Sequence, residues 1–401
     1  MGNNKIFIQI ASYRDPQLIP TIKDCLAKAK NPKNLVFSIA WQHAEEDVWD
    51  NLDEYMFDKR FKIVDIDYRT SQGACWARNE LQKNYDGEEY TLQLDSHHRF
   101  VENWDEECIK MIKHLQNKGH EKPLLTGYIS SFDPENDPDG RNMVPWKMNF
   151  DRFIPEGAVF FLPAAIDNFN DWAEPIPARF YSAHFCFTLG QFCLEVPHDP
   201  NYYFHGEEIS IAVRAYTWGY DLFHPHKIVA WHEYTRKGRR KQWDDDNKWV
   251  TRNLECHKRN RKLFEMDGEV KDIDFGVYDF GTIRSLQEYE AYSGLNFKRR
   301  GVQQYTIDNN LAPNPKIEDP TEYINSFDLG YALEGKVLNF SASLFYRQTI
   351  GTISRIKVFE ENNASSVTFA NIGQSYSYGT EIIASYKPNK WLRNTLSTNV
   401  N

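Results

Sequence analysis

The sequence predicts an α/β domain with a largely parallel sheet, followed by an all-β segment. Over roughly the first 300 residues, apolar segments of strand length alternate with amphipathic segments of helix length, the order in which βαβ units build a parallel sheet. After Pro313-Asn314-Pro315 the helical pattern stops, and apolar and polar residues alternate with a period of two. We therefore expect two domains, residues 1–312 and 317–401.

Local signals predict each element of the first domain. An apolar strand at 5–11 leads into an amphipathic helix at 18–29, which Asn31-Pro32 ends. Strands rich in apolar and β-branched residues follow at 34–41 and 61–68, and Gly73 then precedes a helix. The remaining predicted elements are that helix at 74–83, a strand at 91–95, a helix at 102–117, a strand at 123–129, a helix at 209–218 and a strand at 225–232.

Polar side chains stand at the carboxyl ends of these strands, where open α/β sheets bind their ligands. The segment Leu94-Asp95-Ser96-His97 runs from an apolar strand into an acid and an imidazole. Because residues i and i+2 of an extended chain face the same side, Asp95 and His97 project together. A carboxylate beside an imidazole suits a divalent metal of intermediate hardness, such as Mn²⁺. Further polar residues at strand ends are Ser12, Tyr13 and Gln42.

Three more motifs carry chemistry. Residues 73–79 open a helix and place Arg78 on its first turns. His205-Gly206-Glu207-Glu208 precedes another helix, and the predicted strand at 225–232 ends in His232. A basic run follows at 236–241. Taken singly, each motif also has an ordinary structural explanation, such as a favourable negative charge at a helix start.

Charge and cysteine use exclude several classes of protein. The formal net charge of −10 argues against a nucleic-acid partner. The six cysteines form no C-x-x-C pair, which indicates free thiols in a reducing compartment. The chain enters a strand almost at once, without the pattern of a signal peptide, and no apolar run predicts a transmembrane helix. We expect the first domain to be cytoplasmic.

The order of these motifs resembles the GT-A glycosyltransferases that add N-acetylhexosamine to polypeptides. The resemblance is closest to the cytosolic GlcNAc-transferases that modify hydroxyproline on a ubiquitin-ligase adaptor protein, together with their bacterial relatives. The chain resembles the polypeptide N-acetylgalactosaminyltransferases more distantly. It extends over about residues 5 to 312. The segments that carry it are Ile10-Ala-Ser-Tyr-Arg-Asp-Pro16, residues 73–79, Asp95-Ser96-His97, and Gly206-Glu207 leading to His232.

The resemblance implies a Rossmann-like mixed sheet and a set of site residues. Glu207 is implied as a contact to the donor sugar or the acceptor, and Arg236 as a cation that folds over the diphosphate; we take both as catalytic candidates. The implied ligands of a divalent metal, Mn²⁺ first and Mg²⁺ as the alternative, are Asp95, His97 and His232. The implied donor-binding residues are Ser12, Tyr13, Gln42, Arg78, His184 and Glu207.

The implied reaction is metal-dependent transfer of N-acetylglucosamine from UDP-GlcNAc to a hydroxyl of a polypeptide or glycan, with retention of configuration. A divalent cation neutralises the charge that develops on a leaving diphosphate. Two alternatives stay open. A non-catalytic binder of sugar nucleotides or glycans on the same fold would lack the metal ligands, and a metal-dependent phosphohydrolase usually needs more clustered Asp and His residues.

Residues 317–401 resemble a piece of the barrel of TonB-dependent receptors, with the stretches Ala370-Asn-Ile-Gly and Tyr378-Gly-Thr-Glu381. Alternating residues with aromatics near the strand ends are typical of outer-membrane barrels. We expect about four or five strands, too few to close a barrel. The segment is interpreted as a fused fragment without receptor function, with an accessory β-meander as the alternative.

Overall fold

A computed structural model of the chain describes residues 4–235, 238–315, 323–350, 353–359, 365–371, 374–389 and 392–400. Its contacts divide the chain into two units, Met1–Lys316 and Ile317–Asn401. None of the helices in the described part of the chain combines the length and the apolar character that crossing a bilayer requires.

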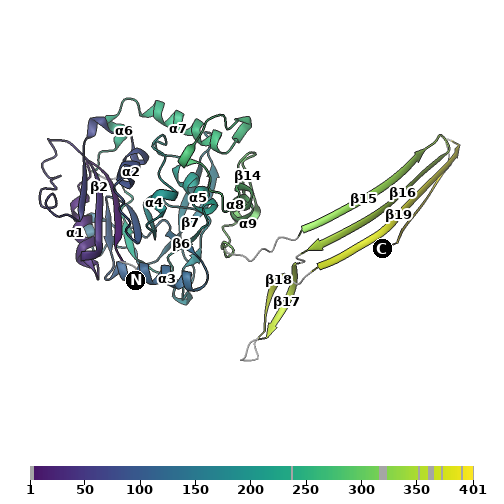
Figure 1. The fold of residues 1–401 in the computed structure, drawn as a ribbon, viewed down its shortest axis with the longest axis horizontal. Coiled ribbons are helices and arrows are strands. Elements are labelled where there is room, and N and C mark those ends of the chain that lie inside the picture. Colours follow the sequence, from purple (N-terminus) through teal and green to yellow (C-terminus); the bar gives the residue numbers. More distant parts are fainter. Residues whose placement is uncertain are drawn as a thin grey trace. The chain divides into compact units, whose positions relative to one another are not determined.

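The first unit is built on an eight-stranded mixed sheet (Figure 1). The four strands from β3 to β4 run parallel, and β10 is antiparallel to both of its neighbours. Because the middle strands are covered on both faces, their side chains are buried along nearly their whole length. The order across the sheet is β3 (Phe61–Asp67), β2 (Leu35–His43), β1 (Ile6–Tyr13), β4 (Tyr90–Asp95), β10 (Phe185–Leu189), β6 (Lys122–Thr126), β11 (Tyr220–His224) and β9 (Ile176–Pro177).

Helices pack on both faces of this sheet (Figure 1). One core joins α1 and α3 to the strands, with apolar residues three or four apart on each helix, as in Trp104, Cys108, Met111 and Leu115. The opposite face packs against α2 and α5. The α-helices are α1 (Leu18–Lys28), α2 (Ala74–Gln82), α3 (Trp104–Asn117), α4 (Phe192–Glu195), α5 (Glu207–Thr217), α6 (Gln242–Asp245), α7 (Trp249–Leu263), α8 (Leu286–Ser293) and α9 (Gln304–Ile307).

A short two-stranded ribbon lies beyond the carboxyl end of β4. It pairs β5 (His98–Phe100) with β12 (Ala230–His232) in antiparallel register. The strand predicted at 225–232 is therefore only three residues long, because β5 offers it just three partners. Two further strand pairs are β7 (Trp146–Phe153) with β8 (Val159–Ala165), and β13 (Leu295–Asn296) with β14 (Gly301–Val302).

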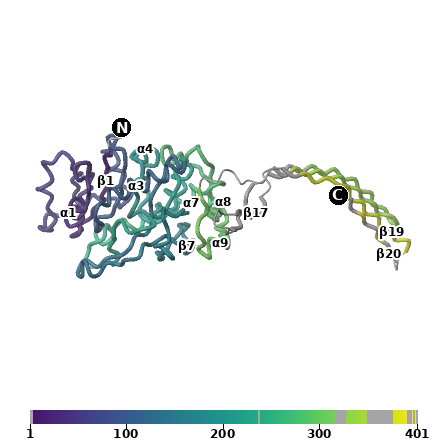
Figure 2. Tube along the Cα trace, turned by 90° about the horizontal axis from the view of Figure 1, so that it is seen from below, coloured from purple at the N-terminus to yellow at the C-terminus, as the bar shows by residue number. Residues whose placement is uncertain are grey.

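The second unit is all β. Four long antiparallel strands form one twisted sheet, in which β19 and β20 run side by side (Figure 2). The apolar residues at alternate positions of β15, from Phe327 to Leu333, are exposed. Phe327 and Leu329 lie in register with the exposed Tyr346 and Leu344 of β16, which gives the sheet an exposed apolar face. The strands are β15 (Tyr323–Glu334), β16 (Leu338–Ile350), β19 (Gln374–Asn389) and β20 (Leu392–Val400), with β17 (Ile353–Phe359) and β18 (Ser365–Asn371) as a separate pair.

Candidate active site

The site lies at the carboxyl ends of the parallel strands. Asp95 is the last residue of β4 and pairs with Ala11 of β1, while Tyr13 at the end of β1 pairs with Gln42 of β2. His97 follows Asp95 before the chain enters β5. The period of two predicted for this segment thus brings the two side chains to one edge of the sheet.

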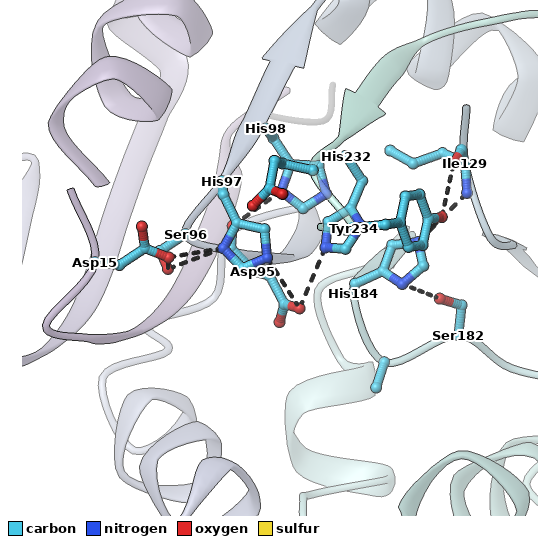
Figure 3. Close-up of polar contacts among 12 residues, drawn as sticks. Asp15, Asp95, Ser96, His97, His98, Ile129, Ser182, His184, His232 and Tyr234 are labelled. Carbon is cyan, nitrogen blue, oxygen red and sulfur yellow. Dashed lines mark hydrogen bonds and ion pairs between the residues drawn. The ribbon is translucent and has the colours of Figure 1, made fainter. Parts of the chain in front are cut away.

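The β5–β12 ribbon carries His232 to the same edge (Figure 3). The Nε2 atom of His232 lies 3.5 Å from Oδ2 of Asp95, and Nε2 of His97 lies 3.8 Å from the same oxygen. One ligand atom from each of Asp95, His97 and His232 lies within 4.8 Å of the others. The backbone N–H of Glu233 donates to the His97 carbonyl at 3.1 Å, which fixes the ribbon against this loop. The three residues predicted as metal ligands therefore lie close enough together to form a candidate site for one ion.

A carboxylate that the sequence reasoning missed supports His97 from behind (Figure 3). Oδ2 of Asp15 lies 2.8 Å from Nδ1 of His97 and accepts a 2.7 Å hydrogen bond from the hydroxyl of Ser96. Burial alone would raise the pKa of Asp15, but His97 and Arg239 hold it well below its usual range. Metal-binding histidines usually give their second nitrogen to such a carboxylate. No local pattern singles out Asp15, which lies two residues beyond the end of β1 and 82 residues before His97 in the sequence.

Arg78 joins two acidic residues of the site. Its guanidinium donates to Asp95 Oδ1 at 2.6 Å and to both carboxylate oxygens of Glu207 at 2.6 and 2.7 Å. His198 approaches Glu207 at 2.9 Å from the other side. Burial would raise the pKa of Glu207, yet the attraction of Arg78 and His198 outweighs it and lowers the pKa to about 2. Glu207 is therefore ionised and held in place at neutral pH.

The residues predicted to hold the donor base lie side by side on β1 and β2. The side-chain amide of Gln42 donates to the Ser12 carbonyl at 2.9 Å and accepts from the Ser71 hydroxyl at 2.6 Å. The Tyr13 hydroxyl donates to Asp245 at 2.9 Å. The Ser12 hydroxyl is buried and has no partner among the described residues. Among these three residues, Ser12 therefore has hydrogen-bonding capacity that the described residues leave unused.

His184 stacks on His232. Its ring lies 4.1 Å from that of His232, nearly parallel to it, and burial lowers the pKa of His184 to about 3. Ser182 contacts its Nδ1 at 3.2 Å, and the backbone N–H of Ile129 donates to Nε2 at 3.3 Å. His184 is therefore a neutral, fully engaged ring that buttresses His232.

A cavity of about 310 Å³ opens beside these residues. Its lining includes the polar residues Asp95, His184, Glu207, Glu208 and His232 and the aromatic residues Phe160, Phe161 and Phe204. A lining that combines polar and aromatic side chains suits a sugar, which has both hydroxyls and apolar C–H faces.

The basic run is only partly described. Arg236, predicted as a catalytic cation, lies outside the described residues. The side chain of Arg239 is 9% exposed and forms ion pairs with Asp15 at 3.1 Å and with Glu233 at 2.6 Å. Arg240 pairs with Asp245 at 3.1 Å. The described part of the run is thus held by carboxylates rather than fully solvated.

Glu208 is expected to make folding stability depend on pH. It accepts hydrogen bonds from the Tyr128 hydroxyl at 2.8 Å and the Ala183 N–H at 2.9 Å, and burial raises its pKa to about 7. A carboxyl with a raised pKa stabilises the fold fully below its unfolded pKa, and this stability is lost as pH rises through about 7. The unfolding free energy of Glu208→Gln, relative to the parent, should therefore rise by about 1–2 kcal/mol between pH 5 and pH 8.

Urea denaturation at the two pH values measures this difference. Glu106 on α3, whose side chain is 42% exposed, offers a control, since Glu106→Gln should show no such rise. An equal offset for Glu208→Gln at both pH values would mean that the carboxyl does not titrate in this range.

Comparison with known proteins gives the family. The model of the family described as Glycosyltransferase (GlcNAc) matches residues 5–56 and 50–299. Residues 314–401 match the model of the Outer membrane protein beta-barrel family. No curated protein matches the chain at a significant level.

Several solved structures match the chain. The crystal structure of GalNAc-T7 with UDP, GalNAc and Mn²⁺ has a TM-score of 0.51 and 12% identity, covering 92% of this chain and 72% of that one. S. aureus TarS 1–349 with UDP-GlcNAc has a TM-score of 0.36 and 11% identity, covering 65% and 75%. The mannosyltransferase PcManGT from Pyrobaculum calidifontis with GDP-Man and Mn²⁺ has a TM-score of 0.37 and 10% identity, covering 58% of each. The family match over most of the chain and the mixed sheet with helices on both faces agree, and the chain belongs to the Glycosyltransferase (GlcNAc) family, with the GT-A fold.

Proposed function

We propose that the chain is a metal-dependent glycosyltransferase that moves N-acetylglucosamine from UDP-GlcNAc to a hydroxyl of a polypeptide or glycan acceptor. The observation that carries the proposal is the grouping of Asp95, His97 and His232 within 4.8 Å at the carboxyl edge of the sheet. In a member of a GlcNAc-transferase family, a three-residue cation site at this edge is best explained by a sugar nucleotide.

The three proposed ligand side chains fit a divalent cation. One carboxylate and two imidazoles suit Mn²⁺, with Mg²⁺ as a harder alternative that favours oxygen ligands. Nε2 of His232 is buried without a hydrogen-bond partner among the described residues, and Asp15 supports His97 as a carboxylate behind a metal ligand would. When bound, such a cation polarises and neutralises the diphosphate as a Lewis acid.

The protein groups around the site orient the donor. Ser12, Tyr13 and Gln42 form the surface for the uridine, and His184 lies below the donor sugar. Arg78 adds positive charge next to Asp95, where the diphosphate would lie. Arg236 supplies a further cation over the leaving group by resemblance to the family.

We assign Glu207 to contacting the donor sugar or the acceptor rather than to covalent catalysis. Both of its oxygens already accept hydrogen bonds from Arg78, so a nucleophilic attack would have to break a buried ion pair. Transfer with retention then proceeds by front-face attack, in which the leaving phosphate takes the proton of the acceptor hydroxyl. In this route Glu207 forms no covalent bond and acts only through its position and its negative charge.

The reaction is tested by incubating the purified chain with UDP-GlcNAc, a panel of peptides and glycans, and either Mn²⁺ or EDTA. The proposal expects UDP release that needs the metal, and a product heavier than its acceptor by one N-acetylhexosamine. UDP-GalNAc and GDP-mannose serve as competing donors. Tight nucleotide binding without turnover on any acceptor would favour a non-catalytic binder instead.

A chain ending at residue 315 is expected to fold and to keep the donor turnover of the full chain within about twofold. All residues assigned to the site lie before residue 240, within the first unit. The shorter chain should also be the more soluble, because it lacks the exposed apolar face of the second unit. Circular dichroism, UDP release and sedimentation of both chains provide the comparison. Loss of acceptor transfer alone would show instead that the second unit takes part in the reaction.

A further inference from the structure

Four histidine rings gather around the proposed metal position (Figure 3). They are His97, His98, His184 and His232. Nδ1 of His97 contacts both Asp15 and Arg239, and both nitrogens of His184 have partners. Apart from the nitrogen of His232 that faces Asp95, two ring nitrogens of the cluster are buried and lack a partner among the described residues: Nε2 of His98 and Nδ1 of His232.

The tautomers of these two rings are set by their other nitrogens. Nδ1 of His98 lies 2.9 Å from the main-chain carbonyl oxygen of Asp95. Because a carbonyl only accepts, this Nδ1 carries the proton and Nε2 of the neutral ring is an acceptor. On His232, Nε2 faces Asp95 at 3.5 Å and is the atom that would bind the metal. A ring that gives Nε2 to a metal keeps its proton on Nδ1, which is then a donor.

The fold brings this donor and this acceptor to neighbouring positions. His98 and His232 are directly paired across the β5–β12 ribbon, and their ring centroids lie 4.9 Å apart. His98 is fully buried, so bulk water cannot satisfy its Nε2. Leaving a buried polar atom unpaired costs about 1–3 kcal/mol, which favours an arrangement that joins the two.

We propose that His98 is a positioning residue for the metal ligand His232. Its Nε2 accepts the Nδ1–H of His232, directly or through one bridging water, and so holds His232 in the tautomer and orientation that present Nε2 to the cation. His98 thereby does for His232 what Asp15 does for His97. The inference rests on the metal centre proposed above.

Two substitutions test the contributions of Nδ1 and Nε2 of His98 separately. His98→Asn keeps a donor near Nδ1 for the Asp95 carbonyl but removes the acceptor at Nε2. His98→Gln keeps an acceptor near Nε2. His224→Asn is a matched control, because His224 is also a buried strand histidine that donates from Nδ1 to a carbonyl, that of Thr126, at 2.8 Å.

The readout is Mn²⁺ affinity, measured on the full chain without nucleotide from the electron paramagnetic resonance signal of free Mn²⁺. We expect His98→Asn to weaken binding about 10- to 100-fold, as loss of a partner behind a metal ligand does, with His98→Gln and His224→Asn within about threefold of the parent. Thermal unfolding of each variant checks the fold.

Each outcome decides the question. Parental affinity in a folded His98→Asn protein overturns the role of His98 and leaves the metal centre standing. Equal weakening in both His98 variants assigns the effect to lost packing and also overturns it. If His98→Asn does not fold, His98→Gln decides alone, and a loss of more than about tenfold contradicts the proposal. Absence of Mn²⁺ binding in the parent overturns this inference together with the metal centre.

Discussion

Replacing His232 by alanine is expected to lower sugar transfer at least about 1000-fold while leaving the protein folded. A bound divalent cation contributes several kcal/mol of stabilisation to a charged transition state, and about 4 kcal/mol corresponds to about a thousandfold in rate. His232 is the cleanest of the three ligands to remove. Asp95 also pairs with Arg78, and His97 also contacts Asp15, so their replacement would disturb more than the cation site.

Metal-dependent UDP release from UDP-GlcNAc and the affinity for Mn²⁺ are the two measurements. Both should fall in His232→Ala, whereas His114→Ala, an exposed histidine on α3, should match the parent in each. Undiminished turnover in His232→Ala, or full activity of the parent in EDTA, would rule out a metal centre at these residues.

Much of this site could be predicted from short-range sequence pattern. The period of two in an extended chain places Asp95 and His97 together, and the strand–helix alternation predicts the sheet edge at which they lie. The helices predicted at 18–29, 74–83 and 102–117 correspond to α1, α2 and α3 with their ends shifted by at most two residues. These features depend on residues that are close together in the sequence, so local pattern is enough to predict them.

Contacts between residues far apart in the sequence could not be predicted from pattern. Arg78 and Glu207 lie 129 residues apart, and no periodicity indicates that one guanidinium joins Glu207 to Asp95. The ribbon of β5 and β12 has only three residues on each side, too few for a pattern to emerge, yet it sets His98 opposite His232. Resemblance to a family supplied His232 as a ligand, whereas the supporting residues Asp15 and His98 became visible only from side-chain contacts.

Arg78→Met is expected to lower the unfolding free energy by about 3–5 kcal/mol at pH 8, the cost of breaking a buried ion pair from one side. Arg78 is 4% exposed and Glu207 is 3% exposed, so water cannot replace the lost partner. A surface pair gives the control. Arg60 and Asp58 are each about one-third exposed, and Arg60→Met should cost less than about 1 kcal/mol.

The pH dependence of this loss distinguishes a broken ion pair from a simple packing defect. In the parent, the pKa of Glu207 is lowered to about 2, so its contribution is present above the unfolded pKa and is lost only as pH falls toward 2. In Arg78→Met, the positive charge that lowers the pKa of Glu207 and of Asp95 is gone. Burial then raises both pKa values relative to the parent, so the variant loses stability as pH rises. The deficit relative to the parent should therefore be largest near pH 8 and shrink toward pH 4. Urea denaturation of parent and variant at both pH values measures it, and a deficit that is the same at both would assign the loss to packing of the long side chain rather than to its charge.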